Sequence, residues 1–238
     1  MQKVISVTAF VLLLSAGPQT TVHGACPAPA AGTLHRVEQV YDGDSLRLSD
    51  GTRVRLSGIN TPELLHGEGA DEPYAVQAKE RLSQLVEDSG RRLRLQRSAE
   101  VRDRYGRLLA HAYNLEGVSL QEQILLAGLG VTHVHPPNLA NRDCYRKAET
   151  QARGIGKGVW TNFPVATSTL EHNDKGFVVL HGRVGRVHNT RRSIWLELQA
   201  GPSLRIARRD LAYFDTLELD SLAGKDIEAR GWLHRHRN

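Results

Sequence analysis

Short runs in which apolar and polar residues alternate dominate this chain, and they predict a protein built mainly from β-strands. The first runs cover residues 34–40, 46–48, 52–56, 93–95 and 109–113. Tight turns are predicted between the first three runs, at Asp42-Gly43-Asp44 and at Ser49-Asp50-Gly51. These three strands therefore form a meander, and if its sheet curls, Asp44 lies near the end of the third strand.

Three segments carry apolar residues at helical spacing instead. The first runs from Ala75 to Val86 with Pro73 in its first turn, and the second covers 120–127 after the capping residue Ser119. The third begins at Asn138 or Asn141 and continues through Arg153, after an extended run over 131–134. Five strands with helices between and after them predict a mainly β, α+β fold: a closed five-stranded OB-type barrel with three helices.

The C-terminal quarter predicts a second, smaller domain. Residues 163–175 lack periodicity and are expected to form a linker, while apolar positions in 177–187, 194–198, 204–206 and 227–233 are typical of strands. A helix is expected over 211–222. The predicted domain, residues 176–238, is therefore β-rich and OB-like, and it follows a larger domain over residues 26–162.

Residues 1–25 have the pattern of a secretory signal peptide. Lys3 precedes an apolar run over 4–16, and small residues allow cleavage after Gly24 or Ala25. A retained membrane anchor is the alternative, but the apolar run is shorter than the ~20 residues that a span requires. We expect an exported protein, periplasmic or secreted, with no stable membrane span.

Cys26 and Cys144 are the cysteines of the chain, and both follow the predicted cleavage site. An even number of cysteines in an exported protein favours one disulfide between them. Lipid modification of Cys26 is the alternative, although the preceding His-Gly-Ala is a poor match to a lipoprotein signal.

Positive charge is concentrated near the C-terminus. The formal net charge is +5, and residues 176–238 contain 11 Lys and Arg against 7 Asp and Glu, whereas residues 26–175 are balanced. This asymmetry predicts that the C-terminal domain faces a polyanion. Eight arginines are expected on its surface: Arg183, Arg186, Arg191, Arg192, Arg205, Arg208, Arg209 and Arg230. Trp195 and Trp232 either stack on bases or pack in the core.

The segment Arg55 to Glu63, R-L-S-G-I-N-T-P-E, gathers polar groups at a strand end. It offers a guanidinium, two oxygen donors at Asn60 and Thr61, and the Glu63 carboxylate. With Asp44 and Arg107 from other turns, this set suits a hard metal ion and a phosphodiester, because planar guanidinium groups match phosphate oxygens. Each element alone is commonly just a turn or a solvated surface residue, so their combination carries the prediction.

Residues 34–161 resemble the staphylococcal nuclease (thermonuclease) family. The resemblance lies in Y-D-G-D-S-L-R-L from Tyr41, in R-L-S-G-I-N-T-P-E from Arg55, in D-R-Y-G-R from Asp103, and in the ending around Gly158-Val159-Trp160. It implies a five-stranded OB barrel with three helices and Ca²⁺-dependent hydrolysis of DNA and RNA, with single strands favoured. A monomer is expected.

The resemblance also implies roles for single residues. Asp44, Asn60 and Thr61 correspond to metal-binding positions, Thr61 through its backbone carbonyl. Glu63 corresponds to the carboxylate that positions or activates water, and Arg55 and Arg107 to the catalytic phosphate-binding arginines. Nucleotide-binding positions correspond to Arg104, Tyr105, Leu109, His133 and His135.

Two departures from the family pattern bear on activity. Asn60 stands where the family usually has a second aspartate, so the site loses one negative charge and metal affinity is expected to fall. His133 and His135 stand in place of tyrosines; they either stack on a base or are solvated loop residues. A nuclease fold that binds nucleic acid with little or no turnover is therefore the alternative function, and an envelope protein with no nucleic-acid role is a third.

Overall fold

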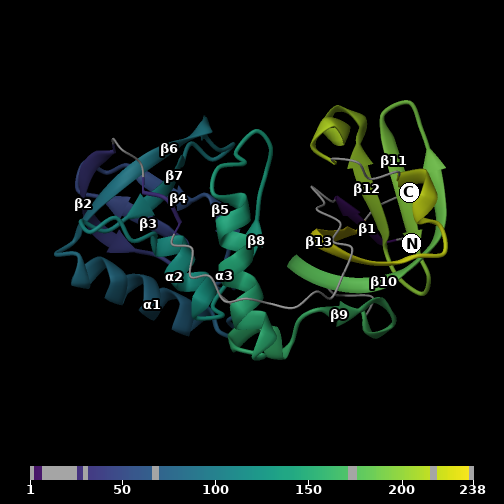
Figure 1. The fold of residues 1–238 in the computed structure, drawn as a ribbon, viewed down its shortest axis with the longest axis horizontal. Coiled ribbons are helices and arrows are strands. Elements are labelled where there is room, and N and C mark those ends of the chain that lie inside the picture. The colour runs from purple at the N-terminus through teal and green to yellow at the C-terminus, as the bar shows by residue number, and fades with distance from the viewer. Residues whose placement is uncertain are drawn as a thin grey trace. The chain divides into compact units, whose positions relative to one another are not determined.

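The computed structural model divides the chain into two compact units, residues 21–161 and residues 162–238 together with 1–20 (Figure 1). It describes residues 3–6, 26–28, 32–65, 70–170, 176–214 and 219–235. Within these ranges, none of the helices combines the length and the apolar character needed to cross a bilayer.

A closed barrel forms the body of the first unit. Its strands follow one another around the barrel in the order β2 (Thr33–Val40), β3 (Ser45–Leu48), β4 (Arg53–Leu56), β7 (Leu108–Tyr113) and β6 (Arg92–Arg102). Neighbouring strands are antiparallel except β4 and β7, which are parallel. Alternate residues point inward and form a buried core that includes Leu46, Leu48, Val54, Leu56 and Leu93. The predicted five-stranded barrel is therefore confirmed.

Three α-helices accompany the barrel: α1 (Ala75–Asp88), α2 (Leu120–Leu126) and α3 (Arg142–Gly154). A short antiparallel pair, β5 (Gly58–Asn60) and β8 (Val131–His133), lies outside the barrel ladder, and η1 (Gly158–Thr161) follows α3. Asn141 is the N-cap residue of α3, and it is one of the two predicted starts of this helix. Pro73 was expected in the first turn of α1 but precedes it, because Tyr74 is the N-cap and has a left-handed backbone with φ of 72°.

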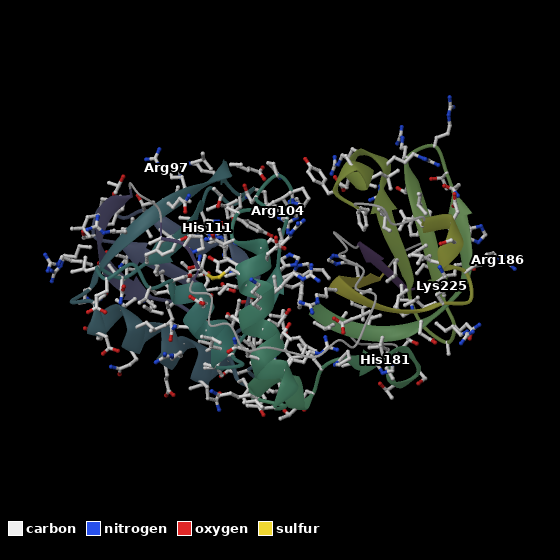
Figure 2. All side chains as sticks on the ribbon, in the orientation of Figure 1. Arg97, Arg104, His111, His181, Arg186 and Lys225 are labelled. Atoms are coloured by element: carbon white, nitrogen blue, oxygen red, sulfur yellow. A yellow bond between two sulfur atoms is a disulfide. The ribbon has the colours of Figure 1, made fainter. Side chains whose placement is uncertain are left out.

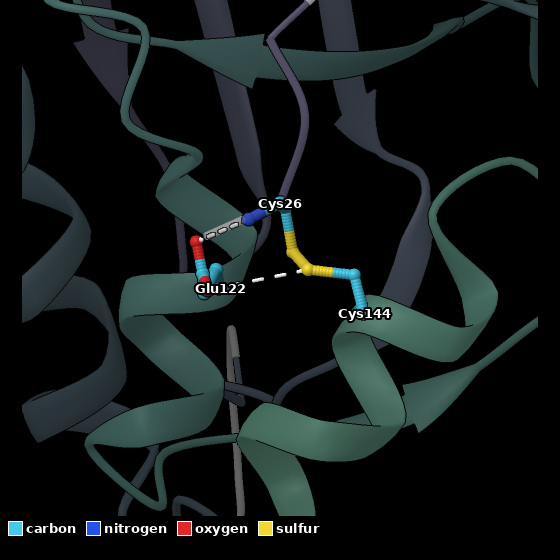
Figure 3. Close-up of side chains that lie close together, drawn as sticks. All are labelled: Cys26, Glu122 and Cys144. Atoms are coloured by element: carbon cyan, nitrogen blue, oxygen red, sulfur yellow. Dashed lines mark hydrogen bonds between the residues drawn. A yellow bond between two sulfur atoms is a disulfide. The ribbon is translucent and has the colours of Figure 1, made fainter. Parts of the chain in front are cut away.

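The predicted disulfide between Cys26 and Cys144 is present and joins the N-terminal arm to α3, across 118 residues of sequence. Its surroundings include a carboxylate from α2, as Figure 3 shows. The backbone N–H of Cys26 donates to Glu122 Oε2 at 3.0 Å, and Glu122 Oε1 lies 4.0 Å from Cys144 Sγ. The N-terminal arm, α2 and α3 are thus held together where Cys26, Glu122 and Cys144 meet.

The second unit is a six-stranded sheet in the order β11 (Ser193–Leu198), β12 (Ser203–Ala207), β1 (Lys3–Ser6), β13 (Asp226–Arg235), β10 (Gly176–Asn189) and β9 (Val165–Ala166). Because β10 also pairs with β11, the sheet curls back on itself. Apolar side chains from β10 to β13 fill its interior. The predicted β-rich second domain is therefore present.

Several details of this unit differ from the sequence predictions. Val165 and Ala166 pair with β10 and are followed by η2 (Thr167–Thr169), so the expected linker contributes an edge strand; residues 171–175 lie outside the described ranges. The helix expected over 211–222 is replaced by two 3₁₀ turns, η3 (Arg208–Tyr213) and η4 (Leu219–Leu222), with 215–218 not described. Strand β1 falls inside the range predicted as a signal peptide.

Arg230 is a correction to the predicted basic surface. Its side chain is buried and its NH2 group pairs with Glu228 Oε1 at 2.9 Å, because a guanidinium inside the sheet requires an anionic partner. Trp232 packs edge-on against Phe177, with ring centroids 5.9 Å apart. Trp195, by contrast, is partly exposed on β11.

His111 on β7 is a buried titratable group in the first unit (Figure 2). Its Nδ1 shares a hydrogen bond of 2.8 Å with the Tyr145 hydroxyl, while its buried Nε2 has no partner among the described residues. The Tyr145 ring comes so close to Gly58 that a Cβ there would lie 2.6 Å from it, and Gly58 has φ of 86°. Burial lowers the pKa of His111 to about 4.

We predict that His111 makes the first unit sensitive to mild acid. Because the folded pKa is below the unfolded value, the unfolded chain binds the proton first, and stability is lost as pH falls from about 6.5 toward 4. The loss from this residue is about 3 kcal/mol in the free energy of unfolding. Urea unfolding of His111→Gln should show a correspondingly flatter pH dependence than the wild type.

His35→Gln is the matched control, since His35 is only half-buried on β2. The prediction is wrong if His111→Gln and His35→Gln lose stability equally between pH 6.5 and pH 4.

Candidate functional site

Asp44 is the centre of a polar cluster at one end of the barrel. It precedes β3, and its backbone carbonyl accepts from Leu56 N at 2.8 Å, which closes the turn onto the end of β4. Only glycine fits beside it: a Cβ on Gly43 would lie 2.6 Å from Ala78 Cβ and 2.7 Å from Thr61 Oγ1. The Asp-Gly-Asp turn thus packs Gly43 closely against α1 and against Thr61, which follows β5.

The Asp44 carboxylate is 2% exposed and fully engaged. Oδ2 forms an ion pair with Arg55 NH1 and accepts from Thr61 N at 2.9 Å, while Oδ1 accepts from Ser45 Oγ at 3.1 Å. Burial raises the pKa of Asp44 to about 6, and the Arg55 guanidinium opposes this rise. An added positive charge would stabilise the charged form of this buried carboxyl.

Asn60 and Thr61 lie beside this carboxylate, and both are buried. The Asn60 side chain uses both of its ends: Oδ1 accepts from Arg55 NH2 at 3.0 Å, and Nδ2 donates to the Thr61 carbonyl at 3.4 Å. Arg55 therefore bridges a carboxylate and an amide oxygen, so its guanidinium lies among the oxygen atoms predicted to bind a metal.

Arg107 reaches the same cluster from the β6–β7 turn. Its Nε donates to Asp103 Oδ2 at 2.7 Å, and its NH1 donates to Ser45 Oγ at 3.4 Å. Asp103 Oδ1 also accepts from the backbone N–H of Tyr105 and of Arg107, which shapes the turn. Ser45 thus links Arg107 to Asp44, and the two predicted catalytic arginines share one site.

Glu63 lies half-buried on the segment that leaves β5. Glu72 holds this segment by accepting from Glu63 N at 2.9 Å, and Glu72 N donates back to the Glu63 carbonyl at 3.1 Å. Burial raises the pKa of Glu63, the charge of Asp44 raises it further, and Arg55 and Arg107 oppose the rise. Among the described residues no ion pair occupies the Glu63 carboxylate.

The predicted nucleotide-binding residues fall into three places. Leu109 is beside Arg55 in the β4–β7 register. Arg104 and Tyr105 form the exposed tip of the β6–β7 turn, where the Arg104 guanidinium stacks 4.7 Å from the centre of the Tyr105 ring (Figure 2). His133, on β8, pairs with Gly58 of β5. His135 follows β8 and is exposed, and its Nδ1 forms a hydrogen bond of 2.8 Å with the Pro136 carbonyl.

The sequence analysis gave no role to the residues that hold the site in shape: Asp42, Ser45, Glu72 and Asp103. Asp42 Oδ1 accepts from Asp44 N at 2.9 Å, an interaction that the Asp-Gly-Asp turn already suggests. The spacing of Asp103 and Arg107 was an equally available signal. Glu72 could not be found this way, since its partner is nine residues distant in a loop.

These groups are chemically suited to a phosphodiester. The two guanidinium groups can hold anionic oxygens, and the half-buried Glu63 has a raised pKa. The buried Asp44 carboxylate, with the amide and carbonyl oxygens beside it, is a donor set for a hard divalent cation. The donor set therefore fits such a cation, although it contains one carboxylate where two would bind it more tightly.

Known proteins resemble this part of the chain. The sequence profile described as "Staphylococcal nuclease homologue" matches residues 53–162. The SPbeta prophage-derived endonuclease YokF of Bacillus subtilis is 31% identical over 145 residues, covering 59% of this chain and 46% of that protein. Endonuclease YncB of the same species is 31% identical over 136 residues, covering 56% and 64%.

Thermonuclease of Staphylococcus intermedius is 30% identical over 132 residues, covering 54% of this chain and 77% of that enzyme. By contrast, the chain spans only about half the length of YokF and somewhat under two thirds of YncB. In each case the similarity covers little more than half of this chain, the share that the first unit makes up.

We predict that Arg55 controls the protonation of Asp44. Arg55→Gln removes the cation beside a buried carboxyl, so the pKa of Asp44 should rise above about 6, by about one to three units. Carboxyl ¹³C NMR titration in metal-free buffer measures this shift. Arg53→Gln on the same strand is the control, because Arg53 is exposed and bonds the Tyr105 carbonyl instead. An unchanged Asp44 pKa in Arg55→Gln would contradict the prediction.

Proposed function

This chain belongs to the staphylococcal nuclease family, and from that premise we propose that it is a metal-dependent phosphodiesterase that hydrolyses DNA and RNA. The observation that carries the proposal is the link from Asp44 through Ser45 to Arg107, with Arg55 on the opposite side of the same carboxylate. The alternative, a nuclease fold that only binds nucleic acid, has one observation in its favour, the contact of Asn60 with Arg55.

The two arginines would bind the substrate phosphate. Hydrolysis of a phosphodiester develops extra negative charge on the phosphoryl oxygens, and preorganised donors lower the energy of that state. Arg55 is held by Asp44 and Asn60, and Arg107 is held by Asp103. Each guanidinium therefore keeps its orientation before substrate arrives, so little is lost in ordering it.

The raised pKa of Glu63 supports a role with the attacking water. Its raised pKa means that the folded site disfavours its charge, and such a carboxylate is a better proton acceptor than a solvated one. The brace from Glu72 fixes the backbone on which it stands. We propose that Glu63 orients the attacking water or accepts its proton.

A divalent cation, Ca²⁺ by our proposal, would be held by Asp44, by the Thr61 carbonyl and by the Asn60 amide oxygen. It would supply positive charge that stabilises the developing phosphate dianion. The raised pKa of Asp44 supports this assignment, because a buried carboxyl of that kind favours a nearby cation.

Export is part of the proposal. The N-terminal pattern of Lys3 and the apolar run supports it, and a disulfide between Cys26 and Cys144 is typical of exported proteins. We further propose that the enzyme acts as a monomer and favours single strands.

We predict that Glu63→Gln abolishes most of the activity without unfolding the protein. The release of acid-soluble nucleotides from single-stranded DNA should fall about 10²- to 10⁴-fold. The midpoint of urea unfolding should stay the same or rise, since the folded state disfavours the Glu63 charge. Glu116→Gln, at an exposed loop position, is the control and should keep full activity. Wild-type rates in Glu63→Gln would overturn the role of this residue.

The binding-only alternative rests on Asn60, whose amide oxygen is engaged by Arg55. Asn60→Asp adds a carboxylate to the proposed metal site, and the Ca²⁺ affinity measured by calorimetry should rise about tenfold. Gln39→Glu adds the same charge at an exposed position of β2 and should leave the affinity unchanged. If the wild type shows no metal-dependent hydrolysis and Asn60→Asp does, the native chain is the binding-only form.

A further inference from the structure

Strands β10, β11 and β12 of the second unit are neighbours in the curled sheet (Figure 1), and the outward positions on these strands include basic residues and Trp195. Along β11 and β12 every second residue is buried in the core, including Leu196 and Ile206. The residues between them therefore point outward. Trp195 is one of them, and it is partly exposed.

The strand register places two rows of these outward residues side by side. His188, Trp195 and Arg205 form one row, because Trp195 pairs with each of the other two. Arg186 and Glu197 pair in the next row, to which β12 contributes the buried Ser203. The Trp195 indole therefore lies between His188 and Arg205 on the same face of the sheet, and Arg186 lies one row away.

Most of the positive charge on this face lacks an acidic partner. Arg186, Arg191, Arg192 and Arg205 form no ion pair among the residues the structure describes. Arg191 and Arg192 lie in the exposed β10–β11 hairpin, and Figure 2 shows Arg186 at the outer edge of the unit. Glu197 is the acidic residue of the two rows, and it pairs with His188 Nε2 at 2.8 Å.

The β10–β11 hairpin that carries Arg191 and Arg192 is held by hydrogen bonds from residues outside it. Arg208 Nε donates to the Thr190 carbonyl at 2.7 Å and its NH2 donates to Asn189 Oδ1 at 3.0 Å. Asn189 Nδ2 in turn donates to Asp220 Oδ1 at 2.6 Å. The basic hairpin therefore projects from a fixed base.

We propose that this face, defined by Arg186, Arg191, Arg192, Trp195 and Arg205, binds single-stranded nucleic acid, with Trp195 stacking on a base and the arginines contacting phosphates. A base offers an aromatic face every nucleotide and a phosphate offers a negative charge at the same interval, which matches an indole set among guanidinium groups. A double strand hides its base faces, so the indole selects single strands. The choice of ligand rests on the proposed function, which requires the protein to meet such chains.

The test measures binding by the full chain without turnover. A fluorescein-labelled 20-nucleotide dT strand and a 20-base-pair duplex are titrated in EDTA, with fluorescence anisotropy as the readout. Trp195→Leu should weaken dT binding about 10-fold, within the ~1–3 kcal/mol that one base stack contributes, and should leave duplex binding unchanged. Arg186→Gln/Arg205→Gln should weaken both and reduce the salt slope on dT by about 1.4.

The control removes two arginines from elsewhere. Arg92→Gln/Arg94→Gln takes the same charge from the outer face of β6 in the first unit and should leave dT affinity within about twofold of the wild type. Equal losses in both double variants would show that only net charge matters and would overturn the proposal. So would unchanged dT binding in Trp195→Leu.

A second measurement does not depend on the variants folding. Ultraviolet cross-linking of wild-type protein to the dT strand, followed by peptide mass spectrometry, should label the peptide that contains Trp195. Labelling confined to the first unit would overturn the proposal.

A dinucleotide is too short to contact both Trp195 and the arginines of this face, so its hydrolysis should be unchanged in Trp195→Leu. If the wild-type protein does not hydrolyse the dinucleotide, the proposed nuclease function is wrong. The dT-binding measurements would still decide whether this face binds single strands.

Discussion

The burial of the Asp44 carboxylate is the constraint on which the candidate site depends. A charged group at 2% exposure requires compensation, and three neighbours provide it: the Arg55 guanidinium, the Thr61 N–H and the Ser45 hydroxyl. These neighbours come from β4, from the end of β5 and from the start of β3. Satisfying one carboxylate therefore fixes the positions of three segments that bring the other polar groups together.

The same compensation explains why Asn60 changes the character of this site. With one carboxylate, the cluster is balanced by one guanidinium, and the amide completes the arrangement by accepting from Arg55 and donating to the Thr61 carbonyl. A second carboxylate at this position would leave an excess of negative charge for a cation to neutralise. With an amide at position 60, the Arg55 guanidinium balances the single negative charge of Asp44.

The two units use charge in different ways. The first unit is nearly neutral overall, and two of its arginines pair with acids at the candidate site: Arg55 with buried Asp44 and Arg107 with partly buried Asp103. The second unit leaves Arg186, Arg191, Arg192 and Arg205 without an ion pair among the described residues, whereas Arg183, Arg209 and Arg230 each pair with an acid. The proposed catalytic site and the proposed nucleic-acid-binding face therefore belong to two separate cores. The disulfide stabilises only the first of them, because both cysteines lie within residues 21–161.

The sequence by itself determined the barrel and predicted which residues belong to the candidate site. Alternation in the five strands and the Asp-Gly-Asp and Gly58 turns are local signals, and they placed Asp44, Arg55 and Arg107 in different strands or turns of one barrel. The tertiary structure decided what those residues contact. That Asn60 faces Arg55, that Ser45 connects Asp44 to Arg107, and that Glu72 braces Glu63 all depend on side-chain contacts between segments distant in sequence. In the second unit the count of arginines predicted a basic surface, but only pairing and burial separated Arg230, neutralised inside by Glu228, from Arg205, which lies in register with Trp195 on the outer face. The spacing of apolar residues along the sequence indicates which face of a strand a residue occupies. The partner of a buried charge is instead fixed by strand register and packing.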